Sequence, residues 1–256
     1  MAIVNVNFNK KQKMKVHLLK ILLYSFLTFQ SILLFSADRY WVGGTGNWSD
    51  KSHWSSVSGG AGGEAIPNAT DNVIVDANSF TAINQTLTIS GSVSCQNFNW
   101  LNTQKNPEFS GKSTAELNVL GSLSINDSYI NSYLGTILFS GNTNNSIFLN
   151  QNINSNIIFS GNGKWNLLSP LNTSGNIKLV SGSLNSNNYT INANGFEGNG
   201  NNARVLDLGT STVTVNSWMF GTTSNLVFNG AKSKIIVLGD WNTSLQRGNL
   251  FYGLLT

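Results

Sequence analysis

The chain has 256 residues, of which 40% are apolar, 11% aromatic and only 10% charged. It is long enough to bury a core, yet it carries much less charge than the roughly 25% of an average soluble domain. The net charge of +4 belongs to the first 36 residues, because five lysines lie there and the rest holds ten basic against eleven acidic residues. This distribution excludes the basic folded surface that nucleic-acid binding needs, and the aromatic content is too high for a disordered chain.

Residues 1–36 have the pattern of a secretory signal peptide. Lysines precede an apolar stretch at 21–35, and the small residues Ser36 and Ala37 follow it. The apolar run of about 15 residues is shorter than the about 20 that a membrane-spanning helix needs. We therefore expect cleavage after Ser36 or Ala37, export, and no stable membrane span afterwards; an uncleaved anchor is the alternative. Because a leader of ordinary length begins at Met14, we expect translation to start there.

Residues 37–80 differ from the rest in their tryptophans and glycines. Trp41, Trp48 and Trp54 lie within 14 residues of one another, and a glycine-rich loop follows at 59–63. Such a cluster suits a compact cap whose indoles cover the end of a stack of sheets. An exposed indole can instead stack on a sugar ring. The three tryptophans are therefore also the candidate glycan-binding residues.

From residue 81 to 256 the sequence consists of short segments with an apolar residue at every second position. Each segment is bounded by Gly, Ser or Asn, and examples surround Leu87, Leu117, Val213 and Leu226. This alternation is the pattern of β-strands. No stretch beyond the leader has a sustained helical period, so the fold class is all-β.

A 20-residue repeat lies within this region. The segment 136–142 recurs at 156–162 and, with one residue inserted, at 176–182. A unit of this length with two or three short strands is one coil of a β-solenoid, in which stacked coils bury a shared core. We predict a parallel β-helix with coils of roughly 20 residues and an N-terminal Trp/Gly-rich cap. The same apolar row then contains Ile137, Ile157 and Ile177, a second contains Phe139, Phe159 and Leu179, and Asn side chains form ladders at the corners.

An antiparallel sandwich is the alternative, since it also uses short strands with frequent turns. The constant spacing of the repeat favours the solenoid.

The C-terminal residues contain no obvious cap. Ile235 begins a strong strand, Trp241 follows, and the apolar, uncharged segment 250–255 nearly ends the chain. An uncovered end coil exposes strand edges that invite pairing with other chains. We therefore expect the chain to be the N-terminal part of a longer polypeptide; the alternative is that the last residues fold back as the cap.

Several of these segments resemble known proteins. Residues 40–50, His53-Trp54, residues 71–76 and Ser79-Phe80 resemble the start of large secreted, repeat-rich surface proteins of Bacteroidetes, and segments at 182–191 and 204–215 are similar more loosely. The resemblance implies a β-helical, adhesin-like protein exported by type IX secretion. The C-terminal secretion signal and repeated adhesion domains of that group are not found here, and the resemblance supplies no catalytic residues.

The chemistry-bearing side chains form no recognisable catalytic pattern. Cys95 is the only cysteine, so it cannot form an internal disulfide, and His53 is the only histidine after the leader. Glu108 and Asp127, 19 residues apart, are the nearest approach to two stacked carboxylates of a glycosidase. The acids around 71–76 match no calcium loop. We assign no catalytic, cofactor-binding or metal-binding residue, and no cofactor.

We therefore expect a non-catalytic protein, secreted or displayed at a bacterial cell surface or in the extracellular matrix, acting as an adhesin-like β-solenoid scaffold. Its partners would be surface glycans or other cell-surface proteins. One alternative is a carbohydrate-binding module that uses Trp41, Trp48 or Trp54. A less favoured one is a polysaccharide-degrading β-helix enzyme, an analogy that rests on the fold alone.

Overall fold

The computed structural model describes residues 14, 15, 17, 18, 20, 36–126 and 129–239. The chain divides into two units, Met1–Phe35 and Ser36–Thr256. The five described residues of the first unit are helical. None of the described helices is long and apolar enough to cross a membrane. Export and cleavage near residue 36 stay predictions, and the expected features at Asp127, Trp241 and 250–255 lie outside the described residues.

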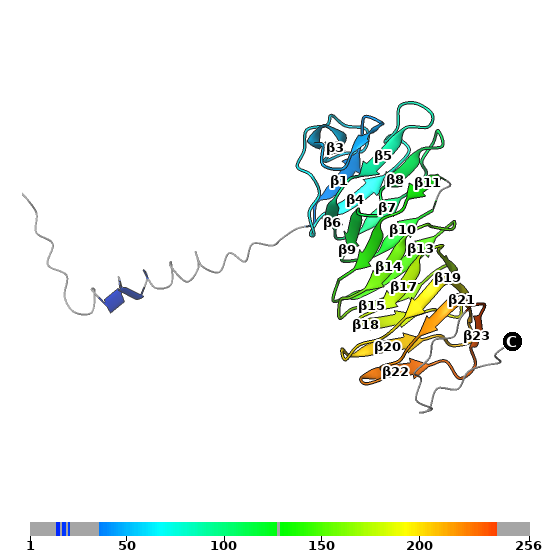
Figure 1. Cartoon of the computed structure of the whole chain (residues 1–256). Coiled ribbons are helices and arrows are strands. Elements are labelled where there is room, and N and C mark those ends of the chain that lie inside the picture. The colour runs from blue at the N-terminus through cyan, green and yellow to red at the C-terminus, as the bar shows by residue number, and fades with distance from the viewer. Residues whose placement is uncertain (1–13, 16, 19, 21–35, 127–128, 240–256) are drawn as a thin grey trace, which may run out of the picture. The chain divides into compact units, whose positions relative to one another are not determined.

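The second unit is a parallel β-helix whose strands stack in three sheets (Figure 1). In spatial order, sheet A contains β22 (Leu226–Asn229), β20 (Arg204–Asp207), β18 (Gly182–Asn185), β15 (Lys164–Leu167), β13 (Asn144–Leu149), β10 (Leu123–Ile125), β7 (Phe98–Trp100), β4 (Asn72–Val75), β1 (Asp38–Trp41) and β3 (Trp54–Ser55). Sheet B contains β11 (Ile130–Tyr133), β8 (Glu108–Gly111), β5 (Thr86–Ile89) and β2 (Gly46–Asn47). Sheet C contains β23 (Lys234–Val237), β21 (Thr212–Met219), β19 (Ile191–Glu197), β17 (Asn176–Leu179), β14 (Asn156–Phe159), β12 (Thr136–Phe139), β9 (Glu116–Val119) and β6 (Ser92–Cys95), with β16 (Leu171–Asn172) paired to β19.

Each early coil runs through the sheets in the order A, B, C, as β7, β8 and β9 do. In the later coils β16 and the first residues of β19 and β21 take the place between sheets A and C. Among the described strands only β1 and β3 pair antiparallel. The predicted parallel solenoid is therefore confirmed, and the antiparallel sandwich is not the fold.

The predicted register of the repeat is also confirmed. Ile137 pairs with Ile157, and Ile157 with Ile177; Phe159 pairs in the same way with Phe139 before it and with Leu179 after it. All six side chains are at most 2% exposed. Because alternate residues of a strand face the same side, one register places both apolar rows in the core.

The coils vary in length along the stack. Stacked partners are 25 residues apart at β7 and β10, 20 apart at β12 and β14, and 22 apart at β20 and β22. The average is about 22 residues, close to the roughly 20 predicted. The longest coil owes its length to the seven residues 101–107 between β7 and β8, whereas the later coils differ mainly at the corner between sheets C and A. That corner has four residues between β12 and β13, two between β17 and β18, and six between β19 and β20.

Stacked aromatic rings fill the interior. Phe139 and Phe159 lie 5.1 Å apart between ring centroids at an interplanar angle of 12°, and Trp165 packs against both, at 5.9 and 5.6 Å. Cys95 is buried in the same core, and burial raises the pKa of its thiol, because the thiolate would have to form away from water. Cys95 is therefore a packing residue and not a reactive one.

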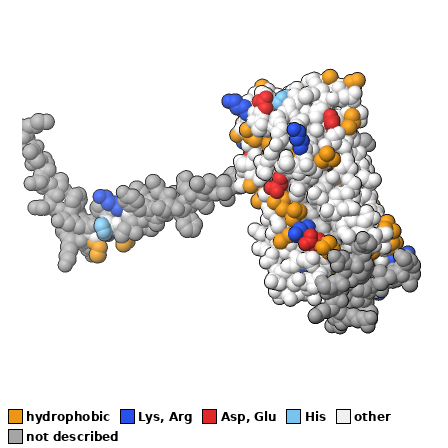
Figure 2. Space-filling model, in the orientation of Figure 1, with side chains coloured by type: hydrophobic (Ala, Val, Ile, Leu, Met, Phe, Trp, Pro, Cys, Tyr) orange, Lys and Arg blue, Asp and Glu red, His pale blue; other side chains and the backbone are white. Residues whose placement is uncertain are grey.

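Outward positions carry small polar side chains that link neighbouring coils. Asn192 Nδ2 donates to Asn172 Oδ1 at 2.6 Å, and Asn216 Nδ2 donates to Asn194 Oδ1 at 3.0 Å. Asparagine side chains therefore link coils as predicted, but these bonds lie on strand residues of β16, β19 and β21, whereas the prediction placed the ladders at the corners. Figure 2 shows the consequence on one face, where neutral polar side chains and backbone (white) dominate and charged side chains form only small groups.

Candidate functional site

The three candidate glycan-binding tryptophans form the buried centre of the N-terminal cap. Trp41, Trp48 and Trp54 are each 0% exposed. Trp54 meets Trp41 at 5.2 Å and Trp48 at 4.9 Å between ring centroids, both edge to face, and His53 stacks on Trp41 at 4.7 Å. A sugar would need an open indole face. None of the three offers one in this structure, so their contacts are those of a hydrophobic cap.

Local hydrogen bonds explain how this segment folds over the first coil. Trp41 Nε1 donates to the carbonyl of Gly44 at 2.9 Å, and Trp54 Nε1 donates to the carbonyl of Trp48 at 2.7 Å. Gly44 has φ +83°, a conformation that favours glycine, so the turn after β1 needs it. The His53 ring contacts the carbonyl of Val42 through Nδ1 at 2.8 Å. His53 is thus held as a cap residue.

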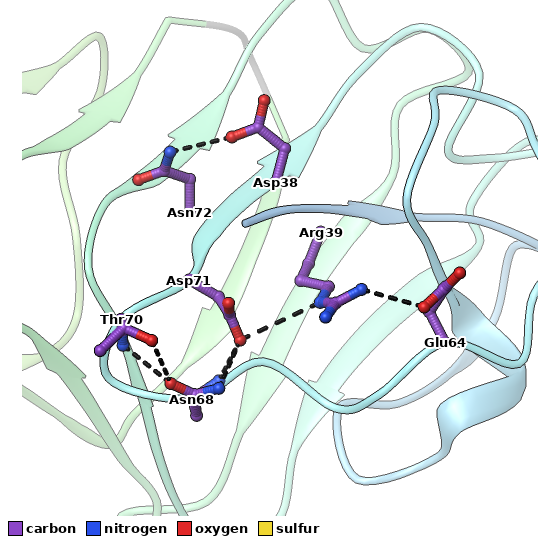
Figure 3. Close-up of polar contacts among 7 residues, drawn as sticks. All are labelled: Asp38, Arg39, Glu64, Asn68, Thr70, Asp71 and Asn72. Carbon is purple, nitrogen blue, oxygen red and sulfur yellow. Dashed lines mark hydrogen bonds and ion pairs between the residues drawn. The ribbon is translucent and has the colours of Figure 1, made fainter. Parts of the chain in front are cut away.

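A cluster of charged side chains lies beside the cap, where Arg39 of β1 contacts two acidic residues (Figure 3). Arg39 Nη1 lies 3.1 Å from Glu64 Oε2, and its Nε lies 4.0 Å from Asp71 Oδ2. The same Asp71 oxygen accepts hydrogen bonds from the backbone N–H of Asn68 at 3.0 Å and its side-chain amide at 2.7 Å. The arginine therefore ties β1 to the loop that leads into β4. The side-chain exposures are 16% for Arg39, 45% for Glu64 and 5% for Asp71.

The remaining acids of this region are engaged locally. Asp50 accepts from the backbone N–H of Ser52 at 2.9 Å and its hydroxyl at 2.8 Å, and these two bonds lower the pKa of the Asp50 carboxyl. Asp76 accepts from the backbone N–H of Asn78 at 2.9 Å. No group of three or more His, Cys, Asp or Glu residues suitable for a metal ion occurs among the described residues.

The strand-borne carboxylates are separated from one another along the stack. Glu108 faces Thr86 and Ile130 in sheet B, and its carboxylate accepts from the Thr86 hydroxyl at 2.9 Å. Glu116 and Glu197 both lie in sheet C, but their partners are not acidic: Glu116 faces serine and threonine, and Glu197 faces lysine and methionine. Asp207 of sheet A faces an asparagine on each side. A glycosidase needs two carboxyl groups across a cleft. No two of these described strand acids are neighbours in the register.

A surface recess of about 590 Å³ lies on sheet A where corners from sheet C arrive. Its lining residues are Asn142, Thr143, Asn144, Asn162, Gly163, Lys164, Gly182, Ser183, Ala203, Arg204, Val205, Asn225 and Val227. They come from five successive strands, β13, β15, β18, β20 and β22, and from the corners before them. Two cations and no acid belong to this set.

Arg204 organises one wall of the recess. It is 1% exposed, and its guanidinium donates to backbone carbonyls of both long corners. In the corner 198–203 it reaches Gly198 O, Gly200 O at 2.6 Å and Asn202 O at 3.0 Å. In the corner 220–225 it reaches the carbonyls of residues 222 and 224, at 3.2 and 2.6 Å. Burial lowers the pKa of Arg204, but arginine remains charged in proteins.

Sequence reasoning did not single out this recess. The available signal was the change in repeat length, since the corner 198–203 adds residues to a coil that otherwise repeats every 20. No protein-family model matches the chain, and no curated protein or solved structure matches it.

Proposed function

We propose that this chain is a non-catalytic secreted protein of the bacterial cell surface or extracellular matrix, in which the β-solenoid acts as an adhesin-like scaffold. One observation carries the proposal: the outward faces present neutral polar ladders on a rigid stack, and neighbouring strands never bring two of the described strand acids together. Such faces suit repeated weak contacts better than proton transfer, which needs positioned acid–base groups. The leader pattern at 1–36 supports export.

Export and display are tested by fractionating cells that produce the full chain and treating intact cells with protease. We expect a processed chain that begins near residue 37 and is degraded from outside. Leu27→Arg in the apolar stretch should keep the precursor in the cytoplasm, whereas His17→Arg, before that stretch, should not. Unprocessed wild-type chain in the cytoplasm would contradict the proposal.

The absence of catalysis is tested by incubating the exported protein with pectin, alginate and neutral glucans. We expect no new reducing ends or unsaturated products above a heat-denatured control. Product formation that Glu108→Gln or Asp127→Ala abolishes would overturn the non-catalytic part of the proposal.

A further inference from the structure

The recess on sheet A combines three kinds of surface that a single ligand can use together. Lys164 and Arg204 contribute positive charge, and no acidic residue lines the recess. The amide of Asn144 and the hydroxyl of Ser183 offer uncharged hydrogen-bonding groups, and Val205 with its register partner beyond it, Val227, forms an apolar strip. The volume of about 590 Å³ falls within the roughly 300–1,000 Å³ of small-molecule sites.

Lys164 has no acidic partner, whereas Lys178 and Arg39 each have one or more. Lys178 on sheet C lies 3.4 Å from Glu197, and Arg39 pairs with Glu64 and Asp71. Lys164 Nζ has no ion pair or hydrogen bond to any residue that the structure describes. Lys164 is partly buried and no acidic residue lines the recess, so an anion placed there would meet an unopposed cation.

The guanidinium of Arg204 adds to the positive electrostatic potential of the recess without binding a ligand directly. Each of its three nitrogens already donates to the backbone carbonyls of the two corners, five carbonyls in all. A charge held at 1% exposure is screened less by salt than a surface charge. Arg204 therefore makes the recess electropositive and also holds its wall in place.

We propose that this recess binds the carboxylate-bearing sugar units of an acidic polysaccharide, a uronic-acid polymer. Lys164 holds the carboxylate, Asn144 and Ser183 hydrogen-bond to ring hydroxyls, and the Val205–Val227 strip contacts the C–H face of the sugar ring. The uncharged amides favour this ligand over a simple inorganic anion, because they can donate hydrogen bonds to sugar hydroxyls and accept hydrogen bonds from them. The inference rests on the proposed surface function and names its partner class.

The test is calorimetric titration of the exported full chain with a hexamer of galacturonic acid, with its methyl ester and with maltohexaose. We expect saturable binding of the acid only. Lys164→Gln should weaken that binding about tenfold, the loss of one charge-assisted contact. Lys164→Arg should retain most of it, and the matched control Lys178→Gln, on sheet C, should leave it unchanged.

Absence of saturable binding by the folded chain would overturn the inference, as would equal binding of the methyl ester, or an equal loss in Lys164→Gln and Lys178→Gln. Equal binding of a sulfated dextran hexamer would also overturn it, because the site would then recognise charge alone. These outcomes are separable from the proposed function. A chain that is exported and displayed but ignores uronates refutes only the ligand, whereas a chain retained in the cytoplasm refutes the surface role whatever it binds.

Discussion

Truncating Phe159 to alanine should destabilise the solenoid strongly. The side chain is 0% exposed and packs between the Phe139 ring and the Trp165 indole. Burial of a phenylalanine and its cavity account for about 3–5 kcal/mol when it is replaced by alanine. Each aromatic pair contributes about 0.5–1.5 kcal/mol beyond its buried area. Because coils above and below hold the neighbouring rings in register, the cavity cannot collapse easily, and we expect the upper part of the 3–5 kcal/mol range.

Urea unfolding of the full chain, followed by circular dichroism and by tryptophan fluorescence, measures this effect. Both probes are needed because solenoids can unfold coil by coil, and a single free energy has meaning only where the two transitions coincide. Ile158→Ala is the matched control, since Ile158 lies next to Phe159 in β14 but faces outward and is partly exposed. It should cost about 1 kcal/mol or less, the span of strand propensities. A loss below about 1 kcal/mol for Phe159→Ala, or equal losses for both variants, would refute the inward register.

Four further outcomes each concern one residue. Arg204→Met should leave five corner carbonyls without their donor and lower the local stability of both long corners by about 2–4 kcal/mol. Backbone amide exchange should therefore become faster in these corners while β12 and β14 stay protected. Equally fast exchange throughout the chain would contradict this. Cys95 should resist iodoacetamide at pH 8 in the native chain and react fully in urea, because burial raises the pKa of its thiol. NMR titration should place the pKa of Asp50 below its ordinary value of 3.8. Ser52→Ala should raise that pKa without restoring it fully, because the backbone N–H of residue 52 makes the larger contribution. Since the folded-state pKa is depressed, this contact stabilises the fold above the ordinary pKa, and the stabilisation is lost as pH falls through the folded pKa. Asn97→Ala, which removes ladder bonds on both sides, should lower stability by about 1 kcal/mol, measured by urea unfolding.

The repetitive part of the fold was predictable because its constraints are local and periodic. Ile137, Ile157 and Ile177 recur at equal spacing, and a period-2 strand allows only one face of each segment to be buried. Asparagine at the corners indicated ladders, since an amide can donate to one neighbouring coil and accept from the other. These features need no knowledge of distant contacts.

The candidate site was less predictable because it depends on exceptions to the repeat. The burial of Trp41, Trp48 and Trp54 is a property of the whole cap: His53 and the turn at Gly44 close over the rings, and nothing in the local sequence distinguishes a covered indole from an open one. The hydrogen-bond partners of Arg204 could not be predicted from the sequence either. A basic residue normally implies an acidic one, but this guanidinium is satisfied by backbone carbonyls, which leave no trace in residue types.

The solenoid separates stability from recognition. Inward positions are tightly constrained, since the side chains there stack on those of neighbouring coils, as Ile157 does on Ile137 and Ile177. Outward positions contribute little packing, so a coil can exchange an asparagine for a lysine at the position of Lys164 without altering its neighbours. The corners shape the surface. Lengthening two of them by a few residues forms a wall beside a flat sheet, provided that a hydrogen-bond donor satisfies the additional backbone carbonyls. Arg204 meets that requirement and leaves its charge in the recess. In such a stack a binding site therefore needs only two lengthened corners, one buried cation that bonds to their carbonyls and one unpaired cation on the sheet beside them, and none of these disturbs the register of the core.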